Sequence, residues 1–413
     1  MIRINAFRAL RPAPGLEKDI ASVPYDVVNT DEAKAMATGN EKSFLHVVRP
    51  EIDLPEGTDL YDDSVYAKAA ENFQRMIEKG WLIREEKPSI YLYRQIMDGR
   101  SQVSIVASSH IDDYNNNLIK KHEKTRKAKE DDRTRHVLTL RANAGPVFLT
   151  LRDTDTINSL IDKDIKQRPV YDFTADDGIQ HTVWIVPDAQ AYIDAFREVP
   201  CTYVADGHHR SASAARAGKE LASQNPHHTG NEEYNWFLTA IFPASQLKIL
   251  PYNRVVKDLQ GKTPEEFLAA LKNTGKVTPL AEGAAPSPTR PATVCIYLDG
   301  KWYELSFPEN SIDRSDPVAS LDVSLLQDRV LSPLLGIRDP RTDNRIDFVG
   351  GIRGTDELER RVDSGEMEVA FSLYPTTVDQ LMAIADANLI MPPKSTWFEP
   401  KLRSGLLVHT LDD

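Results

Sequence analysis

The segment 205–210 reads Ala-Asp-Gly-His-His-Arg and concentrates groups that bind anions. It follows a short apolar stretch at 201–204 and precedes an alanine-rich stretch at 211–217 that favours helix. A helix start exposes backbone N–H groups with partial positive charge, and phosphate groups bind there readily. Gly207 allows close approach of a ligand, and Arg210 can hold two phosphate oxygens at once. The segment therefore predicts a phosphate-binding turn between a strand and a helix.

Other side chains of this turn extend its chemistry. His208 and His209 add side-chain hydrogen-bond donors, and Asp206 adds a carboxylate that could hold Mg²⁺ or orient a hydroxyl group. The alternative is an accidental helix start with solvated histidines. Two adjacent histidines between Asp-Gly and Arg favour a functional site over that alternative.

A second group of candidates is the segment 120–123, Lys-Lys-His-Glu. A carboxylate among cations has a lowered pKa and stays ionised. In a desolvated pocket, Glu123 could therefore act as a general base toward a hydroxyl group. On local grounds alone, a solvated and charged helix start is the better interpretation of these residues.

A third candidate is the segment 391–397, Met-Pro-Pro-Lys-Ser-Thr-Trp. Its two prolines hold the backbone extended before the ammonium group of Lys394 and the hydroxyl groups of Ser395 and Thr396. Such a rigid loop suits a carboxylate or phosphate ligand, although an ordinary surface loop fits the residues equally well.

Several other chemistries are disfavoured by spacing. The pair at 227–228 could join the histidines at 208–209 in a zinc site, but neither pair has a standard zinc spacing. We therefore assign no metal ligands. The glycine-rich segment 350–354 is not a Walker A loop, because no Lys-Ser or Lys-Thr follows it. The sequence also contains no nucleophile elbow and no protein-kinase motif.

The elements that must position these residues are of mixed α and β type. We expect helices at 62–80, 125–140, 188–197, 356–363 and 377–387, with Thr125 capping the second of them. A capping box at 263–266 starts another helix. We expect strands at 90–93, 103–108, 146–151, 201–204, 236–242, 294–298 and 367–374. The segment 281–291 reads as a linker or exposed loop.

Composition narrows the class of protein. The 413 residues allow two or three domains, and 41% hydrophobic with 27% charged residues is typical of a soluble globular protein. The net charge of −12 argues against a nonspecific nucleic-acid binder. No apolar stretch approaches the length of a membrane span and the start lacks a signal peptide, so we expect a cytoplasmic protein. Cys201 and Cys295 could form a bridge, but two free thiols are the better interpretation.

Along its whole length the sequence resembles a bacterial family catalogued as a domain of unknown function, number 1015. The segments 23–28 (Val-Pro-Tyr-Asp-Val-Val), 121–125 and 205–210 carry this match. The later parts are similar to the free serine kinase branch of the ParB/sulfiredoxin superfamily. That branch has Pro-His-Glu, then Asp-Gly-His-His-Arg at a helix start, then Gly-Glu before a strand, a helix and Pro-Lys-Thr-Thr. Here 121–123, 206–210, 365–366 and 393–396 occur in the same order.

The resemblance implies an α+β fold with a mixed-sheet ParB/sulfiredoxin-like core at 101–260. Outside this core, it implies an added N-terminal α/β region at 1–100 and a C-terminal α/β region at 261–413 that completes the substrate site. It implies a kinase that uses Mg²⁺ with ATP or ADP and phosphorylates the hydroxyl group of free L-serine, giving O-phospho-L-serine. The expected partners are thus a nucleotide and serine, with neither nucleic acid nor membrane, and a homodimer is left open.

The resemblance also assigns roles to the candidate residues. Glu123 would take the proton of the serine hydroxyl group, and Asp206 would position that group or the metal. The nucleotide phosphates would be held by Gly207, His208, His209 and Arg210. The amino acid would be bound by Lys394, Ser395 and Thr396.

Two further functions remain open. A ParB-like nucleotide switch would regulate without making phosphoserine, although such a switch does not need a base aimed at an acceptor. A nucleotide hydrolase acting on a phosphorylated metabolite would use the same residues with water as the acceptor. The first hundred residues and the insertion between Leu151 and Val199 have no counterpart in the kinase branch, which leaves the identity of the substrate open.

Overall fold

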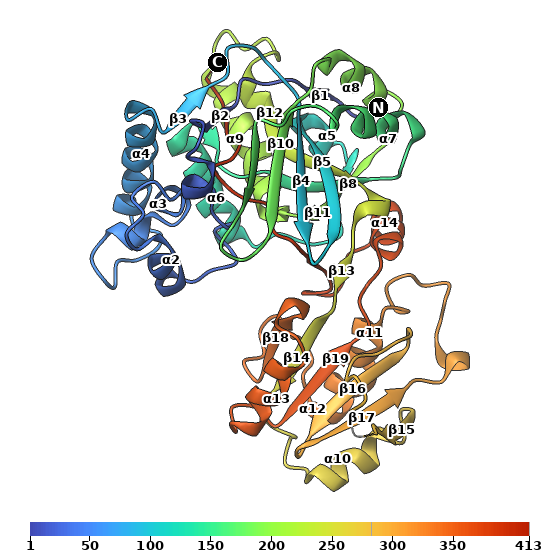
Figure 1. Cartoon of the computed structure of the whole chain (residues 1–413). Coiled ribbons are helices and arrows are strands. Elements are labelled where there is room, and N and C mark those ends of the chain that lie inside the picture. Colours follow the sequence, from blue (N-terminus) through green and yellow to red (C-terminus); the bar gives the residue numbers. More distant parts are fainter. Residues whose placement is uncertain (282, 413) are drawn as a thin grey trace. The chain divides into compact units, whose positions relative to one another are not determined.

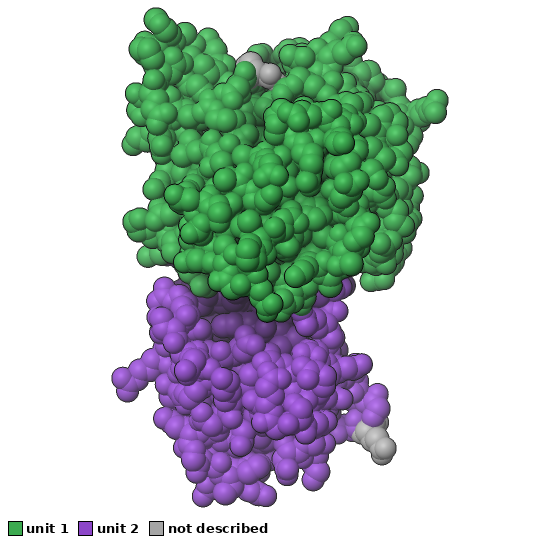
Figure 2. Space-filling view, turned by 90° about the vertical axis from the view of Figure 1, so that its left-hand side faces the viewer, with its two compact units in different colours: residues 1–247, 400–413 green, residues 248–399 purple. Residues whose placement is uncertain are grey.

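The computed structural model of the chain describes residues 1–281 and 283–412. The chain forms two compact units, coloured separately in Figure 2. Unit 1 comprises Met1–Leu247 together with Pro400–Asp413, and unit 2 comprises Lys248–Glu399. Each unit has its own sheet and its own hydrophobic core. The chain therefore leaves unit 1 after residue 247 and returns to it at residue 400.

Among the described residues, unit 1 is built on a nine-stranded sheet (Figure 1). The strands follow the order β6 (Ile119–Lys120), β11 (Thr202–Asp206), β8 (Val147–Leu151), β12 (Trp236–Pro243), β5 (Arg100–His110), β4 (Tyr91–Met97), β10 (Gln180–Ile185) and β9 (Tyr171–Thr174), and β1 (Ile4–Asn5) pairs with β5. β6 with β11 and β8 with β12 pair in parallel, and the other pairs are antiparallel. Unit 1 is thus an α+β structure with a mixed sheet, as the sequence predicts.

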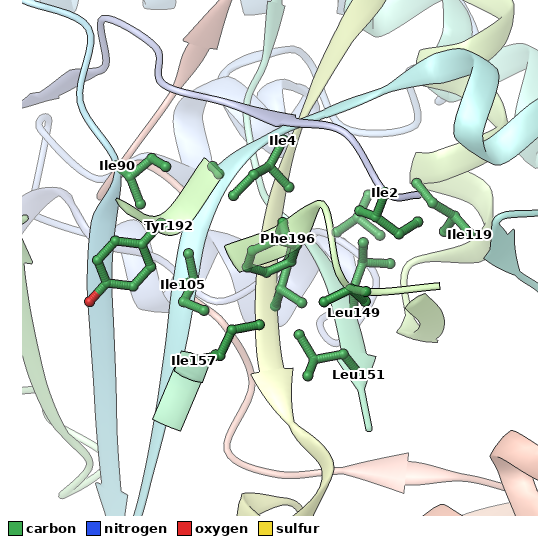
Figure 3. Close-up of a cluster of buried hydrophobic side chains, with 14 of the residues drawn as sticks. Ile2, Ile4, Ile90, Ile105, Ile119, Leu149, Leu151, Ile157, Tyr192 and Phe196 are labelled. Atoms are coloured by element: carbon green, nitrogen blue, oxygen red, sulfur yellow. The ribbon is translucent and has the colours of Figure 1, made fainter. Parts of the chain in front are cut away.

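The segment between β8 and β11 belongs to the core of unit 1. It contains α7 (Asp155–Asp164) and α8 (Ala189–Phe196), and its strand β10 pairs with β4. Ile157, Tyr192 and Phe196 are fully buried, and Figure 3 shows them beside the strand residues Ile105 and Leu149. Removing this segment would therefore expose one face of the sheet.

Helices also surround the turn at 205–210. Helix α9 (His208–Gln224) packs along α6 (Lys127–Leu140) through Val137, Ala217 and Leu221. The N-terminal helices α1 (Glu17–Ile20), α2 (Thr30–Ala37), α3 (Leu45–Val48) and α4 (Asp63–Glu78) form a further apolar cluster, which includes Leu140 of α6. The first hundred residues therefore pack against the elements that carry the turn.

The C-terminal segment 400–412 is embedded in unit 1. Its strand β21 (His409–Thr410) pairs with β7 (Ala142–Asn143). Val408 pairs with Leu10 of β2 (Leu10–Pro12), and β2 pairs with β3 (Leu82–Arg84). Ser404 forms a further bridge with Ser22. These pairings hold the segment against the N-terminal residues 10 and 22 and against β7.

Unit 2 contains a six-stranded sheet within the described residues (Figure 1). Its order is β15 (Lys276–Pro279), β17 (Lys301–Ser306), β16 (Thr293–Leu298), β19 (Val369–Leu373), β14 (Tyr252–Val256) and β18 (Ile346–Gly350), with all pairs antiparallel. Its helices include α10 (Pro264–Leu271), α11 (Asp322–Leu326), α12 (Ser332–Leu335), α13 (Asp356–Asp363) and α14 (Val378–Asp386). β13 (Ile249–Leu250) pairs separately with β20 (Trp397–Phe398). The expected loop 281–291 lies between β15 and β16, and Glu282 in it lies outside the described residues.

Most of the expected elements are confirmed. The helix at 62–80 is α4, whose first turn is capped by Asp62, and the capping box at Thr263 and Glu266 starts α10. Asp98 and Gly99 have positive φ and join β4 to β5 as a hairpin. The prediction that Thr125 caps α6 is wrong. The helix begins two residues later, because the Thr125 hydroxyl group donates to Glu130 Oε2 (2.9 Å) instead of accepting a backbone N–H.

Two smaller expectations concern cysteines and the membrane. Cys201 is half-buried in unit 1, Cys295 is buried in unit 2, and both are free thiols. In the described part of the chain, every helix is too short or too polar to span a bilayer.

Two buried histidines are expected to make unit 1 sensitive to acid. Burial, together with the charge of Arg133, lowers the pKa of His136 to about 4, and burial, together with the charge of Arg403, lowers the pKa of His181 to about 3. His136 Nε2 donates to the Val47 carbonyl group (3.0 Å), and His181 Nε2 accepts from Arg403 Nε (3.3 Å). The unfolded chain binds protons at these rings from about pH 6.5, but the folded chain does so only near pH 4 or below.

The stability of unit 1 should therefore decrease as the pH falls from about 6.5 toward 4, by roughly 3 kcal/mol for each histidine. Thermal unfolding followed by circular dichroism between pH 7 and pH 4 measures this loss. The variant His181→Gln keeps an acceptor for Arg403 and should show a shallower decrease. A Tm that is unchanged between pH 7 and pH 4 would contradict the prediction.

Candidate functional site

The turn at 205–210 has the predicted strand–turn–helix geometry. β11 ends at Asp206, Gly207 has a φ of 98°, and α9 begins at His208. The N-cap residue of this 17-residue helix is Gly207, which has no side chain to cap the helix N-terminus. Its first N–H groups and its partial positive charge can therefore interact with an anionic ligand.

Arg210 folds back over the turn. A Cβ atom at Gly207 would lie 3.1 Å from Arg210 Nε and 3.2 Å from Arg210 Cζ. Arg210 Nη1 donates to the Pro146 carbonyl group, and Nη2 lies 3.9 Å from Asp206 Oδ1. The guanidinium group is thus held against the backbone that would face a phosphate group.

Gly207→Ala is expected to destabilise the protein by about 1 to 3 kcal/mol and also to weaken anion binding, because the added Cβ strains the backbone and displaces Arg210. Gly230→Ala is a matched control. Gly230 has a similar φ of 93°, but a Cβ there has no neighbour within 4 Å. Differential scanning calorimetry should show a loss of stability in both variants, and calorimetric titration with ATP should show weaker binding only in Gly207→Ala. Equal ATP affinities in the two variants would contradict the role given to Arg210.

Asp206 is an ionised carboxylate held between two cations. Lys401 Nζ donates to Asp206 Oδ2 (3.0 Å), and Arg210 Nη2 lies 3.9 Å from Asp206 Oδ1. Burial alone would raise the pKa of Asp206, but the charges of Lys401 and Arg210 lower it well below its ordinary value. Asp206 therefore remains charged throughout the physiological pH range and can accept a hydrogen bond from a hydroxyl group.

Lys401 is the residue of this cluster that sequence reasoning missed. It is 195 positions from Asp206 and lies at the start of the C-terminal segment that returns to unit 1. Gln95 Nε2 donates to the Lys401 carbonyl group (2.9 Å) and so fixes its backbone. Nothing in the local sequence Glu-Pro-Lys at 399–401 predicts that the Lys401 side chain contacts Asp206.

The predicted base segment lies beside the turn because of the sheet. β6 and β11 pair in parallel, so the residues after both strands emerge at the same edge. His122 Nε2 and His208 Nε2 are 3.4 Å apart, with the two rings nearly perpendicular. Glu123, His122 and His208 each place a ligand atom within 4.8 Å of the others. The structure therefore brings Glu123 to the first residue of α9.

The two facing histidines are neutral near pH 7. Both side chains are buried, with 2% of His122 and 6% of His208 exposed. Burial lowers the pKa of His122 to about 4, and burial together with repulsion from His122 lowers the pKa of His208 well below its ordinary value. His209 points elsewhere, since its Nε2 accepts from the Arg126 N–H (3.0 Å). This hydrogen bond thus links the turn to Arg126, the residue before α6.

A pocket in unit 1 is lined in part by Arg210. It holds about 510 Å³ of empty space, part of which is open to solvent. Its lining includes Tyr25, Arg133, Arg210 and Phe237. The Arg133 guanidinium carbon lies 4.1 Å from the centre of the Tyr25 ring. The segment 23–28 therefore contributes to a partly apolar pocket that also includes Arg210 of the turn.

The remaining sequence candidates belong to unit 2. Lys394 is exposed, has a φ of 57°, and its Nζ lies 5.4 Å from the centre of the Tyr252 ring. Ser395 is buried and its hydroxyl group donates to the Pro392 carbonyl group (2.6 Å), which closes the loop. Thr396, which follows in the same loop, is half-buried. The three residues therefore form a tight loop of unit 2, whereas Glu123 and 206–210 belong to unit 1.

Arg254 is a further cationic residue of unit 2. It is buried beside this loop, and its guanidinium group donates to the carbonyl groups of Tyr252 and Pro393. No acidic side chain of the described residues pairs with it, and burial lowers its pKa.

The fold is that of an α+β protein with a mixed sheet, in which a glycine turn precedes helix α9. Residues 4–324 match the family described as protein of unknown function (DUF1015), and the chain belongs to that family. A search of curated proteins found no match.

Solved structures with distant similarity include a free serine kinase in complex with AMP. It has 12% sequence identity and a TM-score of 0.37, with 75% of this chain and 91% of that chain covered. A conserved hypothetical protein from Pyrococcus furiosus has 13% identity and a TM-score of 0.36, covering 74% and 95%. SbnI with a C-terminal truncation, from Staphylococcus aureus, has 11% identity and a TM-score of 0.38, covering 74% and 87%.

Proposed function

We propose that the protein transfers a phosphoryl group from ATP or ADP to the hydroxyl group of free L-serine and releases O-phospho-L-serine. The observation that carries the proposal is the position of Glu123 beside the start of α9. An anion-binding turn alone would suit any phosphorylated ligand. A carboxylate next to it supplies the proton acceptor that transfer to a hydroxyl group requires.

The donor nucleotide is proposed to lie along Arg210. Its phosphates would accept from the first N–H groups of α9 and from Arg210, with Gly207 leaving room for close approach. Its nucleoside would occupy the pocket lined by Tyr25 and Arg133. A purine base stacks well on such aromatic and guanidinium planes.

The acceptor is proposed to react between Asp206 and Glu123. Glu123 accepts the single proton of the serine hydroxyl group as the oxygen attacks the terminal phosphorus atom, and Asp206 keeps Lys401 and Arg210 in position beside the reacting groups. The bond from that phosphorus atom to the bridging oxygen breaks, and the nucleotide leaves with one phosphoryl group fewer. Arg210 and the α9 N-terminus stabilise the charge on the leaving phosphate. We propose that Lys394, Ser395 and Thr396 bind the amino acid.

Mg²⁺ does not fit as an ion held by the protein alone. Asp206 is already neutralised by Lys401 and Arg210, and the groups next to Glu123 are imidazoles. Mg²⁺ prefers oxygen ligands and is commonly held by substrate phosphates. We therefore assign it to the nucleotide, and no step of the proposed transfer relies on a protein-bound Mg²⁺.

The finer fold assignment is part of the same proposal. We propose that the sheet of unit 1 is a ParB/sulfiredoxin-like nucleotide-binding core. The reductive chemistry of sulfiredoxin requires a reactive cysteine in the phosphate turn, and this chain has His208 and His209 there. The two alternatives, a regulatory nucleotide switch and a nucleotide hydrolase, predict nucleotide binding without phosphoserine.

The test is direct. The purified protein is incubated with Mg²⁺, either ATP or ADP, and a panel of hydroxy amino acids that includes L-serine, and the products are identified by mass spectrometry. We expect O-phosphoserine with one of the nucleotides. The absence of a phosphorylated amino acid with both nucleotides across the panel would overturn the proposal.

A further inference from the structure

The facing rings of His122 and His208 have an unusual separation for a hydrogen bond but a suitable one for a shared metal ion. Their Nε2 atoms are 3.4 Å apart, at the long limit for a hydrogen bond. Two nitrogen ligands of a tetrahedral metal, each about 2.0 to 2.1 Å from the ion, lie about 3.3 to 3.4 Å from one another. The two nitrogens therefore already have the spacing of metal ligands.

Glu123 supplies a third donor to the same point. One of its carboxylate oxygens lies within 4.8 Å of the ligand atoms of both histidines. Glu123 is half-buried, whereas both rings are buried. The protein thus offers two buried nitrogen ligands and one half-buried oxygen ligand.

We propose that His122, Glu123 and His208 bind a divalent transition metal of the zinc type, with a fourth position open to water or an oxygen ligand. Two imidazole nitrogens and one carboxylate oxygen form a donor set that zinc uses in sites with an open position. Nitrogen donors select such metals over Mg²⁺ and Ca²⁺, which prefer oxygen. This site was absent from the sequence prediction, because the two histidines meet only through the parallel pairing of β6 with β11.

The burial of the histidines supports a metal rather than a simple ring pair. At most one N–H can be shared between the two Nε2 atoms, which are 3.4 Å apart. Buried polar atoms with weak or missing hydrogen bonds are unfavourable. A metal bound to both Nε2 atoms would replace one weak hydrogen bond with two coordinate bonds.

The metal-bound form and the form proposed for phosphoryl transfer are alternative states. A carboxylate that ligates the metal cannot at the same time accept the proton of a hydroxyl group. The metal site can therefore exist whether or not the chain is a kinase, and it can be tested without any measurement of catalysis.

The test uses the full chain after removal of metals with EDTA and dialysis. Co²⁺ is added while the visible spectrum is recorded, because four-coordinate Co²⁺ absorbs far more strongly than six-coordinate Co²⁺. We expect a strong band that saturates at one Co²⁺ per chain, disappears when Zn²⁺ is added, and persists in a large excess of Mg²⁺. Calorimetric titration with Zn²⁺ should give the same stoichiometry.

Three variants distinguish this site from adventitious binding. Glu123→Gln and His208→Asn should each lower the Zn²⁺ affinity at least tenfold. His227→Asn, in the exposed pair at 227–228, should leave it unchanged. Circular dichroism confirms folding, and if His208→Asn does not fold, the half-buried Glu123→Gln decides. The proposal is overturned if the wild-type chain gives no four-coordinate band, if only His227→Asn lowers the affinity, or if folded Glu123→Gln binds Zn²⁺ as tightly as wild type.

Discussion

Replacing Glu123 with Gln is expected to reduce the turnover of O-phosphoserine by about 10²- to 10⁴-fold while changing nucleotide affinity by less than about threefold. The glutamine keeps the size of the side chain and its hydrogen-bonding capacity but cannot take up a proton near neutral pH. The nucleotide is proposed to contact Gly207, Arg210 and the α9 N-terminus rather than Glu123. The effect should thus appear in kcat, and the affinity for nucleotide should report an intact turn.

The measurement combines phosphoserine formation with calorimetric titration by the nucleotide. Glu220→Gln, on the exposed face of α9, is a matched control that removes a carboxylate of the same helix and should behave as wild type. Full turnover in Glu123→Gln would show that another group acts as the base. A parallel loss of turnover and nucleotide affinity would instead give Glu123 a structural role at the turn.

Replacing Lys401 with Met is expected to destabilise unit 1 and to disable the turn. It would leave Asp206, whose side chain is 28% exposed, without its closest counter-ion. Removing one partner of a fully buried ion pair costs about 3 to 5 kcal/mol, so we expect about 2 to 3 kcal/mol for this partly exposed pair. The pKa of Asp206 should rise toward its ordinary value, and Arg210 should be drawn from the phosphate position toward the unpaired carboxylate.

A double-mutant cycle tests this interpretation. Asp206→Asn combined with Lys401→Met removes both charges of this pair and should be closer to wild type in Tm than Lys401→Met alone, because the carboxylate that lost its closest counter-ion is also gone. Thermal unfolding gives the stabilities, and titration with ATP gives the affinities. If Lys401→Met unfolds at the wild-type temperature and binds ATP normally, the Asp206–Lys401 contact has no role in the site.

The parts of the site that could be predicted from sequence are local in the chain. The strand, Gly207 and helix at 202–224 follow from short-range residue preferences, and the structure confirms them. The contact between His122 and His208 depends on the pairing of β6 with β11, which no local pattern specifies. Lys401 reaches Asp206 only because the chain returns to unit 1 after 152 residues in unit 2, counted from 248 to 399.

In the fold as well, local features could be predicted from sequence and long-range ones could not. Helices α4 and α10 carry their own capping residues; α4 was predicted close to its observed bounds, and α10 was predicted at its observed start. Thr125 failed as a cap, since its hydroxyl group has a competing acceptor in Glu130. The segment between Leu151 and Val199 reads from sequence as an insertion, but it supplies β10 and core residues such as Tyr192. Membership of a shared core is a long-range property that periodicity does not reveal.

The central claim is that Glu123 and the turn at 206–210 transfer a phosphoryl group to serine. A single ³¹P NMR time course of the protein with Mg²⁺, L-serine and either ATP or ADP tests it most directly. We predict that a phosphoserine signal grows at the rate at which the terminal phosphoryl signal of the nucleotide is lost. Growth of inorganic phosphate alone would identify a hydrolase, and unchanged nucleotide signals would identify a binding module. Either of these results would contradict the proposed kinase.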